Sequence, residues 1–509
     1  MQKNTSRVYS AELEGINAKI IEVETDLNVG LHSFNIVGLA DKALNEAKER
    51  VNSALKNLGA KPPNRENRKI TINLAPADIK KTGSHYDLAI ALGYLLATKQ
   101  INHFDPSDKI FIGELSLDGR LRPVFGALNI AESAKKFGFK YLFLPYENAN
   151  EASAIKDLKI IPIKNLEEIV LFLENRKKIE FAQFQKIKLE EEYIPDFGEI
   201  KGQERAKRAL MIAAAGGHNF LMVGPPGVGK SLLAQALIGI LPDLDFEESI
   251  EITKIWSAAG LHLKGLIQKR PFRSPHHTSS LVSIIGGGTN PKPGEISLAH
   301  NGILFLDELP EFPRNILEAL RQPMESGVVH IARSKNTLSF PAKFSLVAAM
   351  NPCPCGFFGD SEKECKCSAY EVLRYEKKIS GPLIDRIDLQ VKITRVPIKE
   401  LNTNSYTPVS QKIKSQIEEA REIQKNRFKN KNLKILTNSQ MNMRQINELL
   451  NLKEDALKFI KTLESQHLSP RSYYRLLKVG RTIADLEKSN FVTGDHLAEA
   501  FSYRLKEEI

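Results

Sequence analysis

The stretch FLMVGPPGVGKSLLAQALIGIL, residues 220–241, decides the fold of the central part of this chain. Its first four residues are apolar and predict a buried strand, and the residues after the glycine-rich turn have helical spacing. Backbone N–H groups of such a turn and of the helix N-terminus can surround phosphate oxygens, which bulky side chains would obstruct. The sequence therefore predicts an α/β nucleotide-binding domain with a phosphate-binding loop formed by Gly224, Pro225, Pro226, Gly227, Val228, Gly229, Lys230 and Ser231.

A second motif, NGILFLDELPEF at residues 301–312, supplies the other half of a nucleotide site. Its apolar run predicts a buried strand that ends in Asp307 and Glu308, so both carboxylates would lie at one edge of the sheet. We expect Lys230 to contact the β- and γ-phosphates of ATP, and Ser231 and Asp307 to hold Mg²⁺. Glu308 is then the residue that orients and deprotonates the attacking water.

The overall composition is that of a folded protein with a positive charge. The chain has 509 residues, a net charge of +11 and 42% hydrophobic residues, which is enough for about two to four domains. The first residues lack the apolar core of a secretory signal, and no apolar stretch approaches the length of a membrane span. We therefore expect a cytoplasmic protein without a membrane partner, and the charge favours a polyanionic one.

The chain divides into four predicted regions. Residues 1–173 alternate strand and helix patterns and form a mixed α/β domain, and the charge-dense residues 174–195 form a linker or a surface helix. Residues 196–395 hold the two nucleotide motifs in an αβα core. Residues 396–509 have mainly helical patterns and form a C-terminal helical lid.

All four cysteines of the chain lie in the segment NPCPCGFFGDSEKECKC, residues 351–367. Reduced thiolates in this number can close a tetrahedral zinc site, although one residue within each pair is a shorter spacing than the usual two to four. The sequence thus predicts a structural Zn²⁺ held by Cys353, Cys355, Cys365 and Cys367.

Together the motifs GPPGVGKS, ILFLDELPEF, LVAAMNPCPCG and GPLIDRIDL closely resemble the Mg-chelatase-like AAA+ ATPases of the ComM/YifB group, and the resemblance covers nearly the whole chain. It implies an AAA+ ring, a homo-hexamer, in which Asn351 is the sensor that positions water or the γ-phosphate. It also implies that Arg386 is an arginine finger supplied to a neighbouring subunit and that Arg471 is a second sensor on the lid. Without the resemblance, a salt bridge from Arg386 to Asp385 or Asp388 remains the alternative.

The resemblance further implies an ATP-driven DNA motor, a helicase that moves branched or single-stranded DNA. It implies branch migration in homologous recombination during natural transformation, in competent cells and alongside recombination proteins. One alternative is a chelatase-type subunit that remodels a protein partner, and another is a non-specific RNA-binding protein.

Basic loops between the motifs are the predicted DNA contacts. The segment at residues 266–302 and the predicted hairpin at residues 325–344 are rich in basic residues, with packing between subunits as the alternative. The candidate residues are Lys269, Arg270, Arg273, His276, His277, Arg333 and Lys335.

The N-terminal region resembles the proteolytic domain of Lon, a ribosomal S5 domain 2-like fold, in the hairpin GELSLDGRLRPV and its surroundings. A Lon-type peptidase needs a serine nucleophile and a lysine base. The resemblance places His85 in the serine position, with Ser84 one residue early, and Leu128 in the lysine position. We therefore expect a Lon-like fold without the catalytic dyad.

Overall fold

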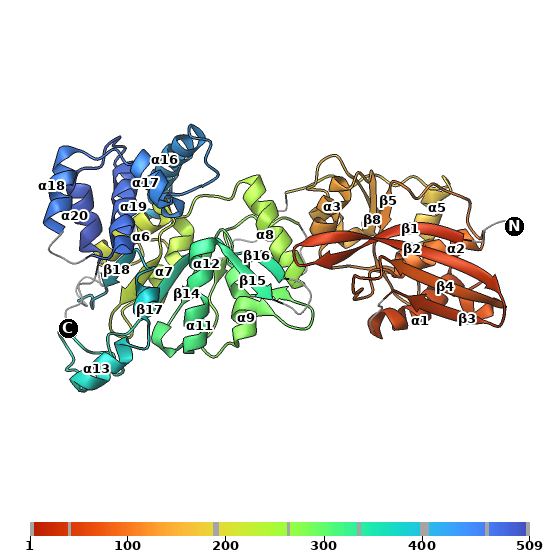
Figure 1. The fold of residues 1–509 in the computed structure, drawn as a ribbon, viewed down its shortest axis with the longest axis horizontal. Helices are drawn as coiled ribbons and strands as arrows, with labels where there is room; N and C mark the ends of the chain where they lie inside the picture. The colour runs from red at the N-terminus through yellow and green to blue at the C-terminus, as the bar shows by residue number, and fades with distance from the viewer. Residues whose placement is uncertain are drawn as a thin grey trace.

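The computed structural model describes residues 5–38, 42–186, 193–261, 265–332, 337–397, 407–463 and 468–504. They form two lobes in an elongated arrangement (Figure 1). One lobe is built on a seven-stranded sheet and the other on a five-stranded sheet with the C-terminal helices packed on it.

The N-terminal lobe has a mixed sheet in the order β3-β4-β2-β1-β5-β8-β9. Its two central strands form an antiparallel hairpin that turns at Gly15, and β5, β8 and β9 continue the sheet in parallel. The strands are β1 (Thr5–Glu14), β2 (Asn17–Val29), β3 (Ser33–Val37), β4 (Arg68–Ala75), β5 (Lys109–Phe111), β8 (Tyr141–Pro145) and β9 (Lys159–Ile163). The predicted turn at Asp118 and Gly119 joins β6 (Glu114–Leu115) to β7 (Leu121–Arg122), which confirms that hairpin.

Helices cover both faces of this sheet because alternate strand residues enter different cores. Leu142 and Leu144 of β8 pack with α3 (Ala127–Lys136) and α4 (Ala149–Ala152), whereas Phe143 packs on the opposite side. That opposite core contains α1 (Lys42–Asn57), α2 (Asp87–Ala97) and α5 (Leu166–Leu173).

The second lobe has a fully parallel sheet in the order β11-β14-β17-β10-β18. Its strands are β10 (Phe220–Val223), β11 (Phe272–Arg273), β14 (Ile303–Leu306), β17 (Ser345–Met350) and β18 (Leu389–Lys392). The apolar runs of β10, β14 and β17 are almost fully buried, as expected for strands covered on both faces. Parallel strands direct all their carboxyl ends to one edge, which is where the phosphate-binding loop and Asp307 begin.

The helices of this lobe occupy the two faces of the sheet. On one face lie α6 (Glu204–Gly216), α7 (Lys230–Ile240) and the C-terminal helices α16 (Ser410–Lys429), α19 (Pro470–Leu486) and α20 (Gly494–Ser502). On the other lie α9 (Leu281–Ile285), α10 (Glu295–Leu298), α11 (Arg314–Ala319), α12 (Arg321–Ser326), α13 (Ala369–Glu376) and α14 (Gly381–Ile384). The remaining elements are α8 (Phe246–Ala259), α17 (Met443–Leu449), α18 (Glu454–Thr462) and the hairpins β12 (Gly286–Gly287) with β13 (Lys292–Pro293) and β15 (Val328–Ala332) with β16 (Thr337–Pro341).

The segment predicted as a linker has no helix or strand in its described residues, 174–186 and 193–195. Part of it packs along the N-terminal lobe, since Ala182 N donates to Ile160 O at 2.9 Å. The alternative of a surface helix is therefore wrong for the described part.

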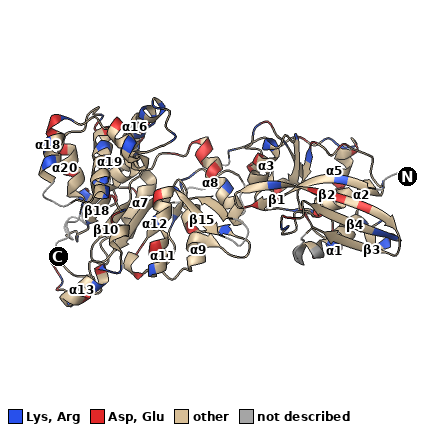
Figure 2. Cartoon of the chain, in the orientation of Figure 1, with Lys and Arg blue, Asp and Glu red and all other residues tan. Residues whose placement is uncertain are grey.

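Basic and acidic residues are interspersed along the helices and strands of both lobes (Figure 2). Many of the basic side chains consequently have acidic neighbours, which matters for the predicted DNA contacts below. Among the described residues, no helix is long and apolar enough to cross a membrane.

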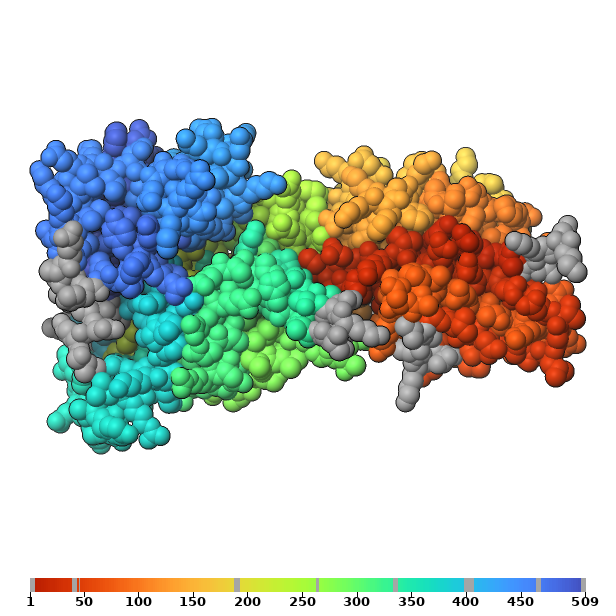
Figure 3. Space-filling model, in the orientation of Figure 1, coloured from red at the N-terminus to blue at the C-terminus, as the bar shows by residue number. Residues whose placement is uncertain are grey.

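The two lobes meet where α3 and α4 approach α8, near the middle of the molecule (Figure 3). Glu151 of α4 is 1% exposed there and accepts a hydrogen bond from Ser257 Oγ of α8 at 2.6 Å. The same oxygen, Oε1, accepts from the backbone N–H of Leu128 at 3.3 Å, and the Asn148 side chain is a further hydrogen-bond partner. Burial raises the pKa of Glu151 to about 7, and these hydrogen bonds only partly oppose it.

We predict that Glu151→Gln removes a pH dependence of the contact between the lobes. Because the folded pKa is raised, the protonated carboxyl stabilises the fold below the ordinary glutamate pKa, and this stability is lost as the pH rises through about 7. The free energy of unfolding of the native chain should fall by about 3 kcal/mol over that interval, and that of Glu151→Gln should stay nearly level. Thermal unfolding from pH 5 to 8 measures this. Asp157→Asn, at a side chain 83% exposed, is the control, and an unchanged pH slope in Glu151→Gln would contradict the prediction.

Candidate nucleotide site

The phosphate-binding loop joins the carboxyl end of β10 to α7, as the sequence predicts. Gly227 and Gly229 have φ angles of +78° and +87°, a region that favours glycine, so the loop can turn sharply with its N–H groups facing inward. The loop borders a cavity of about 420 Å³. The cavity is lined by Pro226, Gly227, Val228, Gly229, Lys230, Ser231, Leu232, Asp307, Glu308, Met350 and Asn351.

Lys230 is held inside this loop by three oxygen atoms. Its Nζ donates to Gly224 O at 2.6 Å, to Pro225 O at 2.9 Å and to Asn351 Oδ1 at 2.9 Å. Burial lowers the pKa of Lys230, while Asp307 and Glu308 act in the opposite direction. The predicted sensor Asn351 and the predicted phosphate-binding lysine are thus in direct contact.

Ser231 and Asp307 also meet, although 76 positions separate them in the sequence: Ser231 Oγ donates to Asp307 Oδ2 at 2.8 Å. A hydroxyl and a carboxylate are hard oxygen donors of the kind that Mg²⁺ prefers. The two residues predicted to hold Mg²⁺ are therefore adjacent, and their chemistry suits that ion.

Glu308 begins the turn after β14 with a φ angle of +52°, and its backbone N–H donates to Asp307 Oδ1 at 2.9 Å. Its side chain is 55% exposed and lies beside His277, with 3.5 Å between Glu308 Oε2 and His277 Nδ1. The ring of His277 also lies against that of His276, with 4.1 Å between the ring centroids and a tilt of 33° between the ring planes. His277 is one of the predicted DNA contacts, and nothing in the neighbouring sequence indicates that it would approach Glu308.

The two predicted nucleotide-contacting arginines lie at the opposite edge of the sheet. Arg386 precedes β18, is 4% exposed and pairs with Glu325 of α12 at 2.7 Å. Arg471, at the start of α19, pairs with the same carboxylate at 2.8 Å. The partner of Arg386 is neither Asp385 nor Asp388, the two carboxylates that the sequence suggested.

Arg471 lines a second cavity of about 660 Å³ at the amino ends of β10, β14 and β17. Two other basic side chains of α19, Arg475 and Lys478, line it too. Asp388 accepts from Arg475 at 2.7 Å, and such partners hold the pKa of the buried Asp388 carboxyl below its usual range despite its desolvation. Neither Arg386 nor Arg471 therefore contacts the phosphate-binding loop of its own chain.

Two of the predicted DNA contacts are already engaged within the chain. Arg270 pairs with Glu248 at 2.8 Å and donates to three backbone carbonyls, and Arg273 pairs with Glu295 at 2.6 Å. Both guanidinium groups therefore have acidic partners within the chain, and their contact with DNA stays a prediction. Lys269 is half-buried and His276 is exposed, whereas Arg333 and Lys335 lie outside the described residues.

The positions equivalent to a Lon-type dyad hold other contacts. His85 Nε2 lies 2.9 Å from Ala11 O, Ser84 Oγ donates to Glu114, and Leu128 is fully buried. The hydrogen-bond partner of Ser84 is thus a carboxylate, whereas a Lon-type serine needs a basic group. The likeness to Lon itself stays a prediction.

Comparison with known proteins places these features in a family. Three family models match: "Magnesium chelatase, subunit ChlI" over residues 196–401, "Subunit ChlI of Mg-chelatase" over 23–148, and its C-terminal model over 408–504. "Competence protein ComM" of Haemophilus influenzae and "Uncharacterized protein YifB" of Escherichia coli are each 41% identical to this chain over 98% of its length and 97% of their own. "DNA replication licensing factor mcm6" of Dictyostelium discoideum is 28% identical over 37% of this chain and 20% of its own length.

Similarity over the full length of the chain, together with the matched family models, shows which group of proteins this is. Membership implies an ATPase that uses ATP and Mg²⁺, and the cavity beside Lys230, Ser231 and Asp307 suits both. The chain belongs to the ComM/YifB family of magnesium-chelatase-like AAA+ ATPases.

Proposed function

We propose that this chain is an ATP-driven DNA motor that works as a homo-hexameric ring and promotes branch migration in homologous recombination, in the uptake of transforming DNA. The main observation in support of a ring is that the nucleotide site and the two arginines lie at opposite edges of one parallel sheet. The DNA substrate rests on the family, the net charge of +11 and the remaining basic loops.

Within one chain, the residues around the 420 Å³ cavity bind and activate ATP. The loop N–H groups and Lys230 hold the phosphates, and Ser231 with Asp307 holds Mg²⁺, which neutralises phosphate charge when bound. Glu308, the more exposed carboxylate, accepts a proton from the attacking water. Asn351 holds Lys230 in position beside the γ-phosphate.

The second half of each active site comes from a neighbouring subunit. Even a strand as short as β10 spans about 13 Å. Groups at its amino end are therefore too far away to reach phosphates at its carboxyl end. In a ring with head-to-tail interfaces, one subunit's amino edge faces the next subunit's carboxyl edge. Arg386 and Arg471 then leave Glu325 to stabilise charge on a neighbour's γ-phosphoryl group.

DNA is the proposed track. One relative is named for competence and another for the licensing of DNA replication, and both names are consistent with a motor on DNA. The proposed phosphate contacts are Lys269, His276 and the sequence-predicted Arg333 and Lys335, which lie outside the described residues. The matched family models favour a second candidate, a chelatase-type subunit that remodels a protein partner.

The first prediction concerns branched DNA. The native chain with ATP should release a labelled strand from a synthetic four-way junction, and Glu308→Gln should bind ATP yet hydrolyse it about 100-fold more slowly or worse, because the amide cannot accept the water's proton. Strand release resolved by gel and phosphate release in the same samples measure both effects.

Lys177→Ala, at a side chain that is 47% exposed and far in the sequence from the nucleotide motifs, is the control that should match the native chain. Hydrolysis without strand release from any junction would overturn the DNA motor and favour the protein-remodelling role.

The second prediction concerns the arginine supplied in trans. Arg386→Ala and Lys230→Ala should each lose ATP hydrolysis, by about 1,000-fold for the arginine. Mixed in equal amounts they should recover about a quarter of the native rate, since some interfaces then join an intact loop to an intact arginine. Phosphate release against mixing ratio measures this, and a mixture as inactive as its components would show that Arg386 does not act across the interface.

The third prediction concerns His277. The 3.5 Å contact restrains Glu308, so His277→Ala should raise DNA-free ATP hydrolysis about three- to tenfold and reduce its stimulation by DNA. His276→Ala is the matched control because it removes the neighbouring histidine ring and not the one that contacts Glu308. Hydrolysis that responds equally to both substitutions would contradict a specific role for the His277–Glu308 contact.

A further inference from the structure

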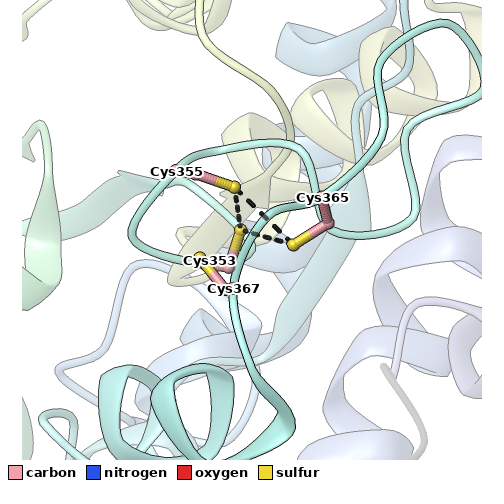
Figure 4. Close-up of side chains that lie close together, drawn as sticks. All are labelled: Cys353, Cys355, Cys365 and Cys367. Atoms are coloured by element: carbon pink, nitrogen blue, oxygen red, sulfur yellow. Dashed lines mark hydrogen bonds between the residues drawn. The ribbon is translucent and has the colours of Figure 1, made fainter.

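The four cysteine sulfurs form one compact cluster in the irregular loop between β17 and α13 (Figure 4). Cys353 Sγ lies 3.4 Å from Cys355 Sγ and 3.7 Å from Cys365 Sγ, which is itself 3.6 Å from Cys355 Sγ. All four sulfurs, including that of Cys367, lie within 4.8 Å of one another, and none is in a disulfide. Zinc–sulfur bonds of about 2.3 Å in a tetrahedron place sulfurs about 3.8 Å apart, so the cluster has nearly the size of a zinc–thiolate centre.

The groups around the cluster suit negatively charged sulfur. The backbone N–H of Phe358 donates to Cys353 Sγ at 3.3 Å, and those of Phe357 and Lys366 hydrogen-bond to Cys355. Outer-shell donors of this kind orient thiolate ligands and stabilise their charge. The described residues 351–368 contain no helix or strand, so an ion at the centre would be the main restraint on this loop.

The same loop packs directly on the nucleotide site. Gly356, between the ligands, has a φ angle of +87°, and a Cβ placed there would lie 2.7 Å from Pro226 Cδ and 3.9 Å from Asn351 Cγ. Pro226 belongs to the phosphate-binding loop, and Asn351 contacts Lys230. The turn that carries the cysteines therefore packs against Pro226 and Asn351 and helps to hold both residues in place.

A second anchor ties the loop to the end of β18. Asp360 accepts from Arg395 Nε at 2.8 Å, and the Arg395 guanidinium lies 5.8 Å from the centre of the Phe357 ring. Displacing the loop would break this buried carboxylate's ion pair as well as the Pro226 contact. The loop, the phosphate-binding loop and the strand end behave as one packed unit.

We infer that the four cysteines bind one Zn²⁺ and that this ion holds Pro226 and Asn351 in the positions that nucleotide binding requires. The inference rests on the proposed nucleotide site and is independent of whether the track is DNA. Zinc content and nucleotide affinity are measured separately. A failure of the zinc inference can therefore be distinguished from a failure of the proposed nucleotide site.

Metal content of the full chain, purified without added metal, tests the site. We expect about one zinc per chain by elemental analysis, and less than about a tenth of that in Cys365→Ser/Cys367→Ser. A mercurial reagent should release the zinc from the native chain, and zinc added after a thiol reductant should restore it. Native protein that binds a fluorescent ATP analogue but holds no zinc would overturn the inference.

Two glycine substitutions test the coupling without touching a ligand. Gly356→Ala should keep its zinc but bind the fluorescent ATP analogue about tenfold more weakly, because its new methyl group meets Pro226. Gly359→Ala is matched, since Gly359 has a φ angle of +73° in the same loop but no atom within 4 Å of a built Cβ. It should retain zinc and bind the analogue within about twofold of the native chain. An equal loss of affinity for the ATP analogue in both variants would show that backbone strain is the cause. It would overturn the coupling between the cysteine loop and the nucleotide site.

Discussion

Everything in the nucleotide site depends on the register of three parallel strands. The register pairs Leu306 of β14 with Ala348 of β17, and Val223 of β10 with Met350 of β17, so three segments leave the sheet at nearly the same level. The phosphate-binding loop, Asp307 and Asn351 each begin at such an end, and side chains 76 and 121 positions apart come within hydrogen-bond distance. A slip of one residue would turn the apolar side chains of a strand to the wrong face, so burial of the cores also fixes the site.

The parallel sheet has a second consequence, because its two edges carry different chemistry. Phosphate-binding groups and carboxylates lie at the carboxyl ends, while Arg386 and Arg471 lie at the amino ends. In the ring proposed above, the arginines of one chain would complete the nucleotide site of the next. ATP hydrolysis would then be a property of the interface between subunits rather than of the folded chain.

Local patterns predicted the parts of this protein that local sequence determines. The loop at 224–231, the strand that ends at Asp307 and the hairpin GELSLDGRLRPV all follow from glycine placement and apolar periodicity. The clustering of the cysteines was predicted for the same reason, since all four lie in one loop.

Partners that are distant in sequence were not predicted. The sequence next to Arg270, Arg273 and Arg386 does not indicate which carboxylates will neutralise them. Their partners, Glu248, Glu295 and Glu325, lie on the separate helices α8, α10 and α12. The sequence of a basic loop therefore does not show which of its charges have acidic partners within the chain. The contact between His277 and Glu308 likewise depends on β11 lying beside β14, which only the sheet order establishes.

Glu325 accepts from two arginines at once, and its side chain is 44% exposed. In the proposed ring, this carboxylate pairs with both arginines for as long as a neighbour's nucleotide is absent from the interface. A neighbour's nucleotide must then displace it, and a triphosphate, with its greater negative charge, competes better than a diphosphate. The affinity between adjacent subunits of the proposed ring would thus vary with the nucleotide between them. Each hydrolysis event would weaken one interface of the ring.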